Sequence, residues 1–161
     1  MHIHHFARSA AQAVNAHDVD SVVALWAEPA RYDSPLTGPQ NGIAALRERE
    51  IALFGGFSDL TATCTPLGQE GNTGAMLVRF VGTHDGNYAG IAPTGRAVNL
   101  EMVAIVEFDD DGRVIAERVM LDSAAVIRQT RRLSLRRKAQ GGPGADFLDS
   151  SCTRTKGCAR L

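Results

Sequence analysis

The chain has 161 residues, of which 44% are apolar and 22% charged, and its formal net charge at pH 7 is −1. This length and composition are typical of one globular domain, and the near-zero charge argues against nucleic-acid binding, which needs a basic face. No apolar run approaches the length of a transmembrane helix, and the N-terminus lacks the apolar core of a secretory signal. We therefore expect no membrane contact and a cytoplasmic location.

Helical periodicity dominates the first third of the chain. Apolar residues recur at helical spacing over residues 3–14. Asp18 is placed to cap a second helix, which should run through Trp26 and end at Pro29. The segments that follow are expected to be a short strand over residues 30–35, a turn-rich link over 36–42 and a third helix over 43–54.

After residues 55–56, both glycine, the apolar pattern changes to the two-residue period of strands. Pro66 predicts a bulge or a sheet edge in the first strand. The DDDG sequence at residues 109–112 predicts a hairpin between the last two strands. A further helix should begin at Ser123. The four strands are expected over residues 61–69, 73–84, 97–108 and 114–122.

Helices followed by consecutive antiparallel strands predict an α+β domain over residues 1–135. A strongly curved sheet wrapped around the early helices would form a cone with an apolar interior. The glycine-rich segment 82–101 would then lie at the mouth of a pocket. Residues 136–161 begin with basic side chains and continue with Gly, Ser and Cys. We expect them to form a disordered tail, with a nucleic-acid or membrane-surface arm as the alternative.

The three cysteines suit a reducing compartment. Cys64 lies in a strand-like run, whereas Cys152 and Cys158 lie near the C-terminus, where unpaired thiols or one disulfide both fit the spacing. Zinc would need more ligands at closer spacing than these cysteines provide. The histidines of residues 2–5 could hold a metal weakly, but N-terminal histidines are usually solvated. We therefore expect no bound metal.

Asp122 ends the last predicted strand, on the same face as Arg118 and Met120. Both faces of this strand are largely apolar, so we expect it to be covered on both sides. Desolvation there would raise the pKa of Asp122 towards a range useful for acid–base catalysis, and a nearby Arg118 would oppose that rise. The alternative is that Asp122 caps the helix that begins at Ser123.

His84 closes the apolar face of its strand just before the glycine-rich segment. It could lie at the pocket rim as a proton donor or as a group that orients a carboxylate, or it could be a hydrogen-bonded structural residue. Arg96 follows a Pro-Thr-Gly turn, which would present its guanidinium to solvent or to a substrate carbonyl. Asp33, two residues before Pro35, could line the same cavity or cap a turn.

The apolar walls of such a cavity would come from residues that also suit plain core packing. The sequence lacks the GxGxxG, P-loop, GxSxG and HExxH motifs. A cofactor-free acid–base enzyme or a non-catalytic binder fits this absence. The wall candidates are Trp26, Tyr32, Phe57, Met102 and Met120.

Three segments resemble the SnoaL-like polyketide cyclase (ester cyclase) branch of the NTF2-like superfamily, and the similarity extends over roughly residues 6–129: YDSPLTGPQNGIAALREREIALFGGFSDL, FVGTHDGNYAGIAPTGR and DGRVIAERVMLDSAAVIRQ. The resemblance implies an α+β cone with a deep pocket, no metal or organic cofactor, and a homodimer or larger assembly formed through the outer face of the sheet. Cyclases of this family close a ring by intramolecular aldol condensation, with an aspartate of the last strand as general acid and base. Asp122 matches that aspartate, and His84 matches the histidine of the GTH segment.

The implied function is cofactor-independent ring closure of a small hydrophobic substrate that contains carbonyl groups. Asp122 would remove a proton alpha to one carbonyl, the enolate would attack a second carbonyl, and Asp122 or His84 would protonate the new alkoxide. An isomerase or epoxide hydrolase on the same cone, using Asp122 or Asp33 with Tyr32, is one alternative. A non-catalytic small-molecule-binding module is another.

Overall fold

The computed structural model describes residues 2–130, so the predicted tail over 136–161 and the end of the predicted last helix lie outside the described residues. Among the described residues, no helix is long and apolar enough to cross a membrane. The elements, in chain order, are α1 (Ile3–Asn15), α2 (Val19–Val23), β1 (Trp26–Asp33), β2 (Gln40–Asn41), α3 (Ile43–Gly56), β3 (Thr61–Glu70), β4 (Thr73–His84), β5 (Arg96–Phe108), β6 (Val114–Leu121) and α4 (Ser123–Thr130).

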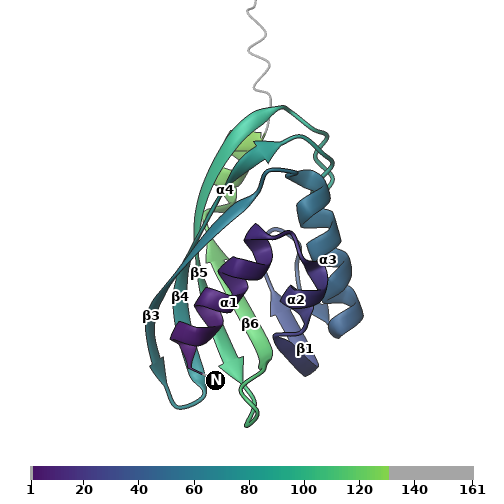
Figure 1. The fold of residues 1–161 in the computed structure, drawn as a ribbon. Coiled ribbons are helices and arrows are strands. Elements are labelled where there is room, and N and C mark those ends of the chain that lie inside the picture. Colours follow the sequence, from purple (N-terminus) through teal and green to yellow (C-terminus); the bar gives the residue numbers. More distant parts are fainter. Residues whose placement is uncertain (1, 131–161) are drawn as a thin grey trace, which may run out of the picture.

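One six-stranded sheet, with the strand order β2-β1-β6-β5-β4-β3, forms the framework (Figure 1). Strands β3 to β6 are consecutive antiparallel neighbours, as predicted, whereas β1 runs parallel to β6. This parallel pairing sets Tyr32 of β1 beside Glu117 of β6. Residues from the first and the last parts of the domain therefore meet in the middle of the sheet.

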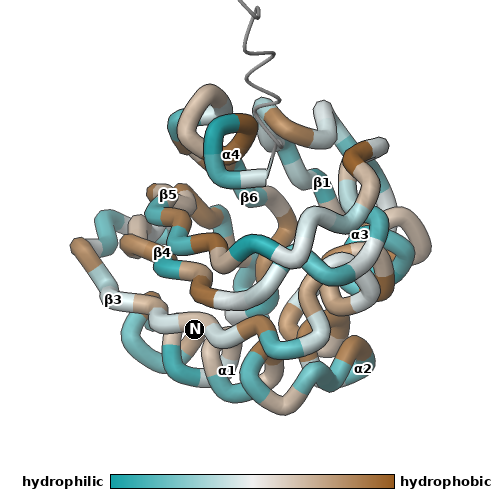
Figure 2. The backbone as a smooth tube through the Cα atoms, turned by 90° about the horizontal axis from the view of Figure 1, so that it is seen from above, coloured by the Kyte–Doolittle hydropathy of each residue, from teal (hydrophilic) through white to brown (hydrophobic). Residues whose placement is uncertain are grey.

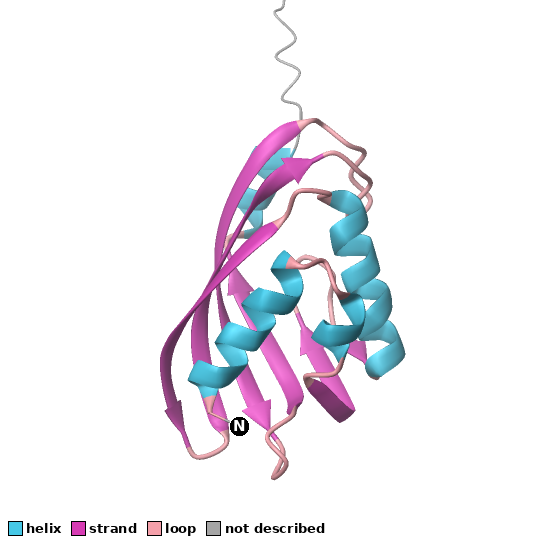
Figure 3. Cartoon of the chain, viewed as in Figure 1, coloured by secondary structure: helices cyan, strands magenta, loops and turns pink. Residues whose placement is uncertain are grey.

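The helices α1, α2 and α3 lie on one face of the sheet, and α4 lies near one end of it (Figure 3). Seen from above, the strands form a curved wall whose open side is closed by these three helices (Figure 2). The predicted α+β arrangement, with early helices held inside a curved sheet, is confirmed. The space between the two layers is where an enclosed site can form.

The helices differ in how they face this interior. The buried residues of α1 recur at helical intervals, and the Phe6 ring meets Phe108 of β5 edge-on, with 5.6 Å between centroids. The inner face of α3 carries Leu46, Glu50, Leu53 and Gly56. A carboxyl group thus interrupts the apolar stripe of α3, which burial alone would disfavour.

The second helix is shorter than predicted. It ends at Val23, and both Trp26 and Pro29 belong to β1. The helical spacing of apolar residues extends past the end of the helix to Trp26. Trp26 is buried, but its backbone belongs to a strand. The register between β1 and β6 shifts between Trp26 and Arg31. Pro29, which has no backbone N–H, lies in this irregular stretch, where the ladder lacks regular pairing.

Two local predictions from the sequence are confirmed: the bulge or sheet edge at Pro66 and the hairpin at residues 109–112. β3 is the edge strand of the sheet, and its register shifts between Pro66 and Gly68. The hairpin between β5 and β6 is closed by a hydrogen bond of 2.8 Å from Asp109 N to Arg113 O. Gly112 completes the turn at a φ of 80°, a conformation that glycine adopts without strain.

The glycine-rich loop between β4 and β5 docks on the C-terminal end of α3. The N–H groups of Asp85 and Gly86 both donate to the carbonyl oxygen of Gly56, at 3.2 and 3.1 Å. A side chain at Gly86 would overlap the carbonyl oxygen of Gly55. Glycine therefore allows the two backbones to approach closely, and the loop is fixed to the helix through main-chain contacts.

Candidate functional site

The interior between helices and sheet holds two adjoining cavities of about 70 and 40 Å³. We call them the inner lobe and the outer lobe. The inner lobe is also lined by Trp26, Cys64, Glu50 and Glu117, and the outer lobe by Phe57, Tyr88 and Val126. The two lobes share part of their walls, so these side chains separate them. The shared residues are Tyr32, Arg49, Leu53, Phe80 and Met102.

Glu117 is the acidic residue that β6 contributes to the inner lobe. It shares its face of the strand with Val119, which is buried, and it is itself partly buried. Burial raises the pKa of Glu117 to about 7, an effect that the charge of Arg49 opposes and the carboxyl of Glu50 reinforces. A carboxyl group that titrates near neutral pH can both accept and donate a proton there.

Arg49 and Glu50 are neighbours on α3 and form an ion pair through Arg49 Nη2 and Glu50 Oε1. The guanidinium carbon of Arg49 also lies 3.9 Å from the centre of the Tyr32 ring. Burial acts to lower the pKa of Arg49, but Glu50, Tyr32 and Glu117 more than offset it, so this side chain keeps its charge. Burial raises the pKa of Glu50, against the opposing charge of Arg49.

The tyrosine and cysteine side chains that line the lobes are neutral at pH 7. Burial raises the pKa of Tyr88 to about 12 and that of the Cys64 thiol to about 12. Burial also raises the pKa of Tyr32, although Arg49 opposes this. The two lobes therefore combine apolar walls with one arginine, two carboxyl groups and phenolic hydroxyls. Such a site can move a proton and bind a charged oxygen without a metal ion in either step.

His84 is fully buried beneath the glycine-rich loop, with 0% of its surface exposed. Its Nδ1 lies 3.1 Å from Oγ1 of Thr94, and its ring centroid lies 5.2 Å from that of Phe57. Its Nε2 has no hydrogen-bond partner among the described residues. His84 lines neither lobe. Phe57, whose ring lies next to that of His84, and Tyr88 line the outer lobe instead. His84 lies behind the cavity wall and not at a rim.

Asp122 lies outside both lobes and caps α4. Its Oδ1 accepts a hydrogen bond of 3.0 Å from Ala125 N, and its Oδ2 accepts one of 3.1 Å from Arg128. The Ala125 N–H, followed by Arg128, lowers the pKa of Asp122. The expectation that burial raises this pKa is wrong, because 62% of the side chain is exposed. The capping alternative from the sequence describes the observed geometry.

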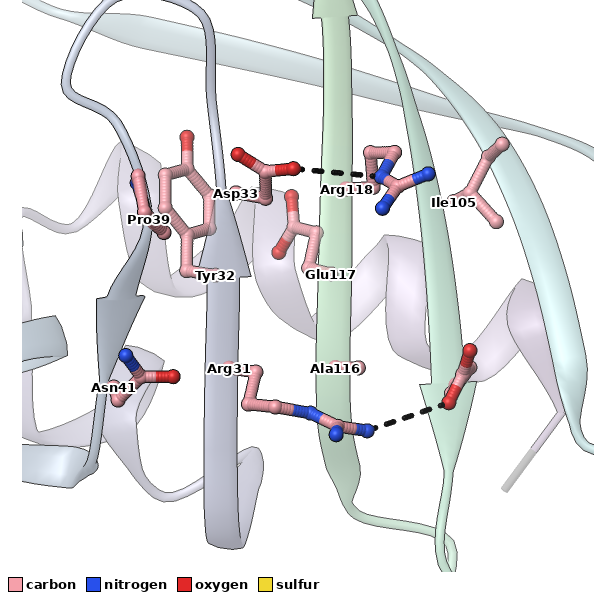
Figure 4. A pocket seen from close by; sticks show the side chains of 10 residues that line it. Arg31, Tyr32, Asp33, Pro39, Asn41, Ile105, Ala116, Glu117 and Arg118 are labelled. Carbon is pink, nitrogen blue, oxygen red and sulfur yellow. Dashed lines mark ion pairs between the residues drawn. The ribbon is translucent and has the colours of Figure 1, made fainter.

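Several other candidates from the sequence lie on the outer face of the sheet or at its end. Asp33 pairs with Arg118 at 3.5 Å across β1 and β6, and Arg31 pairs with Glu107 (Figure 4). Met120 is 49% exposed, so β6 is not covered on both sides in the single chain. Asp33 and Met120 therefore do not line the interior. Arg96 is exposed at the start of β5.

These outer ion pairs cross a groove of about 490 Å³ between β1, β2, β5 and β6 (Figure 4). The groove is larger than either lobe, but four of its charged residues, Arg31, Asp33, Glu107 and Arg118, are exposed and paired with one another. The fifth, Glu117, is partly buried and also lines the inner lobe. Surface pairs of this kind do little to change the chemistry of a carboxyl group. We therefore place the candidate site in the interior, where the strongly shifted Glu117 lies.

The structure brings Trp26, Tyr32, Phe57 and Met102 to the two lobes, as expected from the sequence. The sequence reasoning did not single out the charged residues that accompany them. The sequence feature that could have identified them is a charged residue within an otherwise apolar pattern. Glu50 stands on the helical stripe of Leu46 and Leu53, Arg49 stands beside it, and Glu117 alternates with Val119 on the inner face of its strand. Among residues 2–130, no cluster of three His, Cys, Asp or Glu side chains could hold a metal.

Several solved structures share this architecture. A proposed SnoaL-like polyketide cyclase from Jannaschia sp. CCS1 matches with a TM-score of 0.70 and 22% identity, over 80% of this chain and 90% of that one. IdmH, a proposed polyketide cyclase of Streptomyces antibioticus, gives 0.65 and 23%, over 79% and 96%. An NTF2-like protein of unknown function from Burkholderia pseudomallei K96243 gives 0.65 and 19%, over 81% and 98%. At these identities the likeness shows the fold.

Comparison with protein families gives a more direct result. The model of the SnoaL-like polyketide cyclase family matches residues 4–130, which is nearly the whole of the described chain. No curated protein matches the chain. Because the family model covers far more than half of the sequence, the chain belongs to the SnoaL-like polyketide cyclase family.

Proposed function

We propose that this chain catalyses cofactor-independent, intramolecular ring closure of a compact carbonyl compound in the inner and outer lobes, with Glu117 as general base and acid. The observation that carries the proposal is a carboxyl group with a pKa of about 7, beside Arg49, in a cavity whose walls are largely apolar. Membership of the SnoaL-like family supports a cyclase as the class of enzyme. Glu117 takes the role that the strand pattern and the resemblance gave to Asp122.

The proposed reaction has two proton transfers and one carbon–carbon bond. The Glu117 carboxylate takes a proton from a carbon alpha to a carbonyl, and the electrons of that C–H bond form an enolate. The enolate carbon attacks a second carbonyl carbon of the same molecule, whose π electrons move to its oxygen. Glu117 then returns its proton to this alkoxide. The cavity contributes by holding the two reacting carbons together, which is a large effect for an intramolecular step.

The size of the lobes favours a small substrate. Their volumes of about 70 and 40 Å³ lie below the roughly 300–1,000 Å³ of most ligand pockets. A bound substrate must therefore be compact and must displace side chains that now separate the lobes. Met102 is the most adaptable of these, because its side chain is unbranched and flexible. We accordingly propose an acyclic or monocyclic substrate and not a polycyclic one.

The test uses a methyl β-keto ester whose chain carries a second ketone placed for six-membered ring closure. Purified protein should convert it to a cyclic product of unchanged mass, which mass spectrometry and NMR identify together. The Glu117→Gln variant should lose about 10²–10⁴-fold in turnover, the usual contribution of a general base. Turnover by the wild type should rise with pH through about 7, since the carboxylate is the reactive form.

Glu107→Gln is the matched control, because Glu107 lies on the exposed outer face and pairs with Arg31. This variant should turn over as the wild type does. Unchanged turnover in Glu117→Gln would contradict the role of Glu117. Saturable binding of keto esters without any conversion would instead favour the small-molecule-binding module.

A second candidate function follows from the presence of two carboxyl groups that both interact with Arg49. Glu50 and Glu117 both have raised pKa values and both line the inner lobe. One could activate a water molecule while the other protonates an epoxide oxygen, which is the division of roles that epoxide hydrolysis needs. The two reactions are separated by product mass, because hydrolysis adds one water and ring closure adds nothing.

We also propose that the chain forms a homodimer through the outer face of the sheet. Leu77, Val103 and Met120 are cross-strand neighbours on β4, β5 and β6 of that face. Leu77 and Val103 are partly buried, and Met120 is exposed. An apolar stripe on the outer face of a sheet is a common form of self-association surface.

A further inference from the structure

Arg49 is a charged side chain placed within the cavity wall, where it belongs to the lining of both lobes. Only 14% of its side chain is exposed. Its Nη2 pairs with Glu50, and its guanidinium lies against the face of the Tyr32 ring. Its Nε is buried and has no hydrogen-bond partner among the described residues.

An arginine fork offers five N–H donors in a fixed plane. A buried donor without an acceptor lowers the stability of a folded protein, so structures rarely retain one without a use. Among the described residues, none accepts a hydrogen bond from Nε of Arg49. Glu50 and Tyr32 contact the same guanidinium at other points. A ligand oxygen in the lobes can supply that acceptor.

Resting on the ring-closing function proposed above, we propose that Arg49 binds the ligand oxygen on which negative charge develops, and that the site therefore takes compact 1,3-dicarbonyl compounds as their enols or enolates. Glu117 is a weak base, and the hydrogens of a simple ketone are too weakly acidic for it. The carbon between two carbonyls is far more acidic. Pairing the resulting enolate oxygen with a guanidinium adds a charge-assisted hydrogen bond.

The charges of the site stay balanced during this proton transfer. Before it, the negative charge rests on Glu117, which Arg49 already favours in its ionised form. Afterwards Glu117 is neutral and the same charge rests on the ligand oxygen. Arg49 interacts with both positions, and its ion pair with Glu50 holds it in place throughout. The net charge of the cavity is therefore constant, and a fixed cation stabilises the product of the transfer.

The test measures binding, so that it is independent of turnover. Cyclohexane-1,3-dione is the enolised probe, and cyclohexanone is the neutral compound of similar shape. We expect calorimetry with the wild type to give affinity for the dione on the order of tenfold or more above that for cyclohexanone, because charge-assisted hydrogen bonds are the stronger ones.

The variant Arg49→Met has a side chain of similar reach without a donor or a charge. It should bind the dione about tenfold less tightly while binding cyclohexanone nearly as the wild type does. Arg49→Lys keeps the charge but loses the planar fork, and should fall between the two. Arg47→Met is the matched control, since Arg47 lies on the same helix and pairs with Asp20 at the surface. That control should bind both probes as the wild type does.

Should Arg49→Met fail to fold, the Nε–H resonances of the arginines in wild-type protein give the second measurement. One resonance should shift on addition of the dione and stay unchanged with cyclohexanone. An undiminished preference for the dione in Arg49→Met, or no arginine resonance that responds to it, overturns the proposal. Failure of the ring-closing function would appear differently, as selective dione binding by the wild type with no turnover of any keto ester.

Discussion

Glu117 lies within β6 and Asp122 directly follows that strand, and their pKa values move in opposite directions. Glu117 faces the apolar inner lobe, so burial favours its neutral form. Asp122 faces solvent and accepts the Ala125 N–H, which favours its charged form. The strand period correctly predicts that these two side chains face opposite sides. It could not show which side is buried, because Met120 makes the outer face look equally apolar in the sequence.

The stability of Glu117→Gln relative to the wild type should depend on pH. In the unfolded chain this carboxyl titrates near its ordinary value of 4.5, whereas in the folded protein it titrates near 7. Between these values the unfolded chain releases a proton that the folded protein keeps, so the folded protein loses stability as pH rises. Urea unfolding at pH 5 and pH 8 should show the variant gaining about 1–3 kcal/mol on the wild type at the higher pH.

The same comparison with Glu107→Gln should show no such change between the two pH values, since Glu107 is exposed. Arg49 and Glu50 are the charged groups that face Glu117, and both remain in each variant. A pH-independent difference between Glu117→Gln and the wild type would mean that Glu117 is hydrated and titrates normally in the folded protein.

At the scale of single elements, α3 and α4 supply the parts of the site that the sheet does not. α3 presents Arg49 and Glu50 between the buried Leu46 and Leu53. Burial of these two leucines therefore determines where the charged side chains lie. α4 closes the outer lobe with Val126. It is held at its far end by Gln129, whose side-chain amide makes hydrogen bonds of 2.7 and 3.0 Å with the backbone N–H and C=O of Asn99.

Substitutions of Asp122 should affect the helix and not the chemistry. Asp122→Asn keeps an oxygen for the Ala125 N–H, so α4 should stay folded and turnover should remain within about twofold of the wild type. Asp122→Ala removes the cap, and hydrogen exchange over residues 123–130 should become faster. If Asp122→Asn were inactive while hydrogen exchange in α4 stayed as slow as in the wild type, Asp122 would take part in the reaction together with Glu117.

At the scale of the whole molecule, the sequence predicts the architecture better than the site. Period-two runs after residue 60 predict β3 to β6 closely, because each alternation reports one buried face. The early chain is harder to interpret. Trp26 continues a helical pattern although it belongs to a strand, and Pro29 fits that strand only where the register shifts. Arg49, Glu50 and Glu117 come together through folding alone, since the sequence separates α3 from β6 by more than fifty residues.

The proposed homodimer gives a prediction at this scale. Size-exclusion chromatography with light scattering should give the wild type twice the mass of one chain. Met120→Lys places a charge at the exposed end of the apolar stripe and should yield monomers, because a buried unpaired ammonium is strongly disfavoured. Ile51→Lys, at an exposed position on α3, should leave the dimer intact. A wild-type monomer at micromolar concentrations would rule the dimer out.

The docking of the glycine-rich loop on α3 has a consequence for how this protein could diversify. Its anchor consists of the N–H groups of Asp85 and Gly86 on the carbonyl of Gly56, and of the Asp85 carboxylate, which accepts hydrogen bonds from the N–H and hydroxyl groups of Ser58. This attachment depends on residue identity at Asp85 and at Gly86, where a side chain would overlap Gly55. Residues farther along the loop, of which Tyr88 already borders the outer lobe, can therefore change without moving Arg49 or Glu50. Selection for a new ligand can act on the entrance while the proton-transfer machinery is inherited intact.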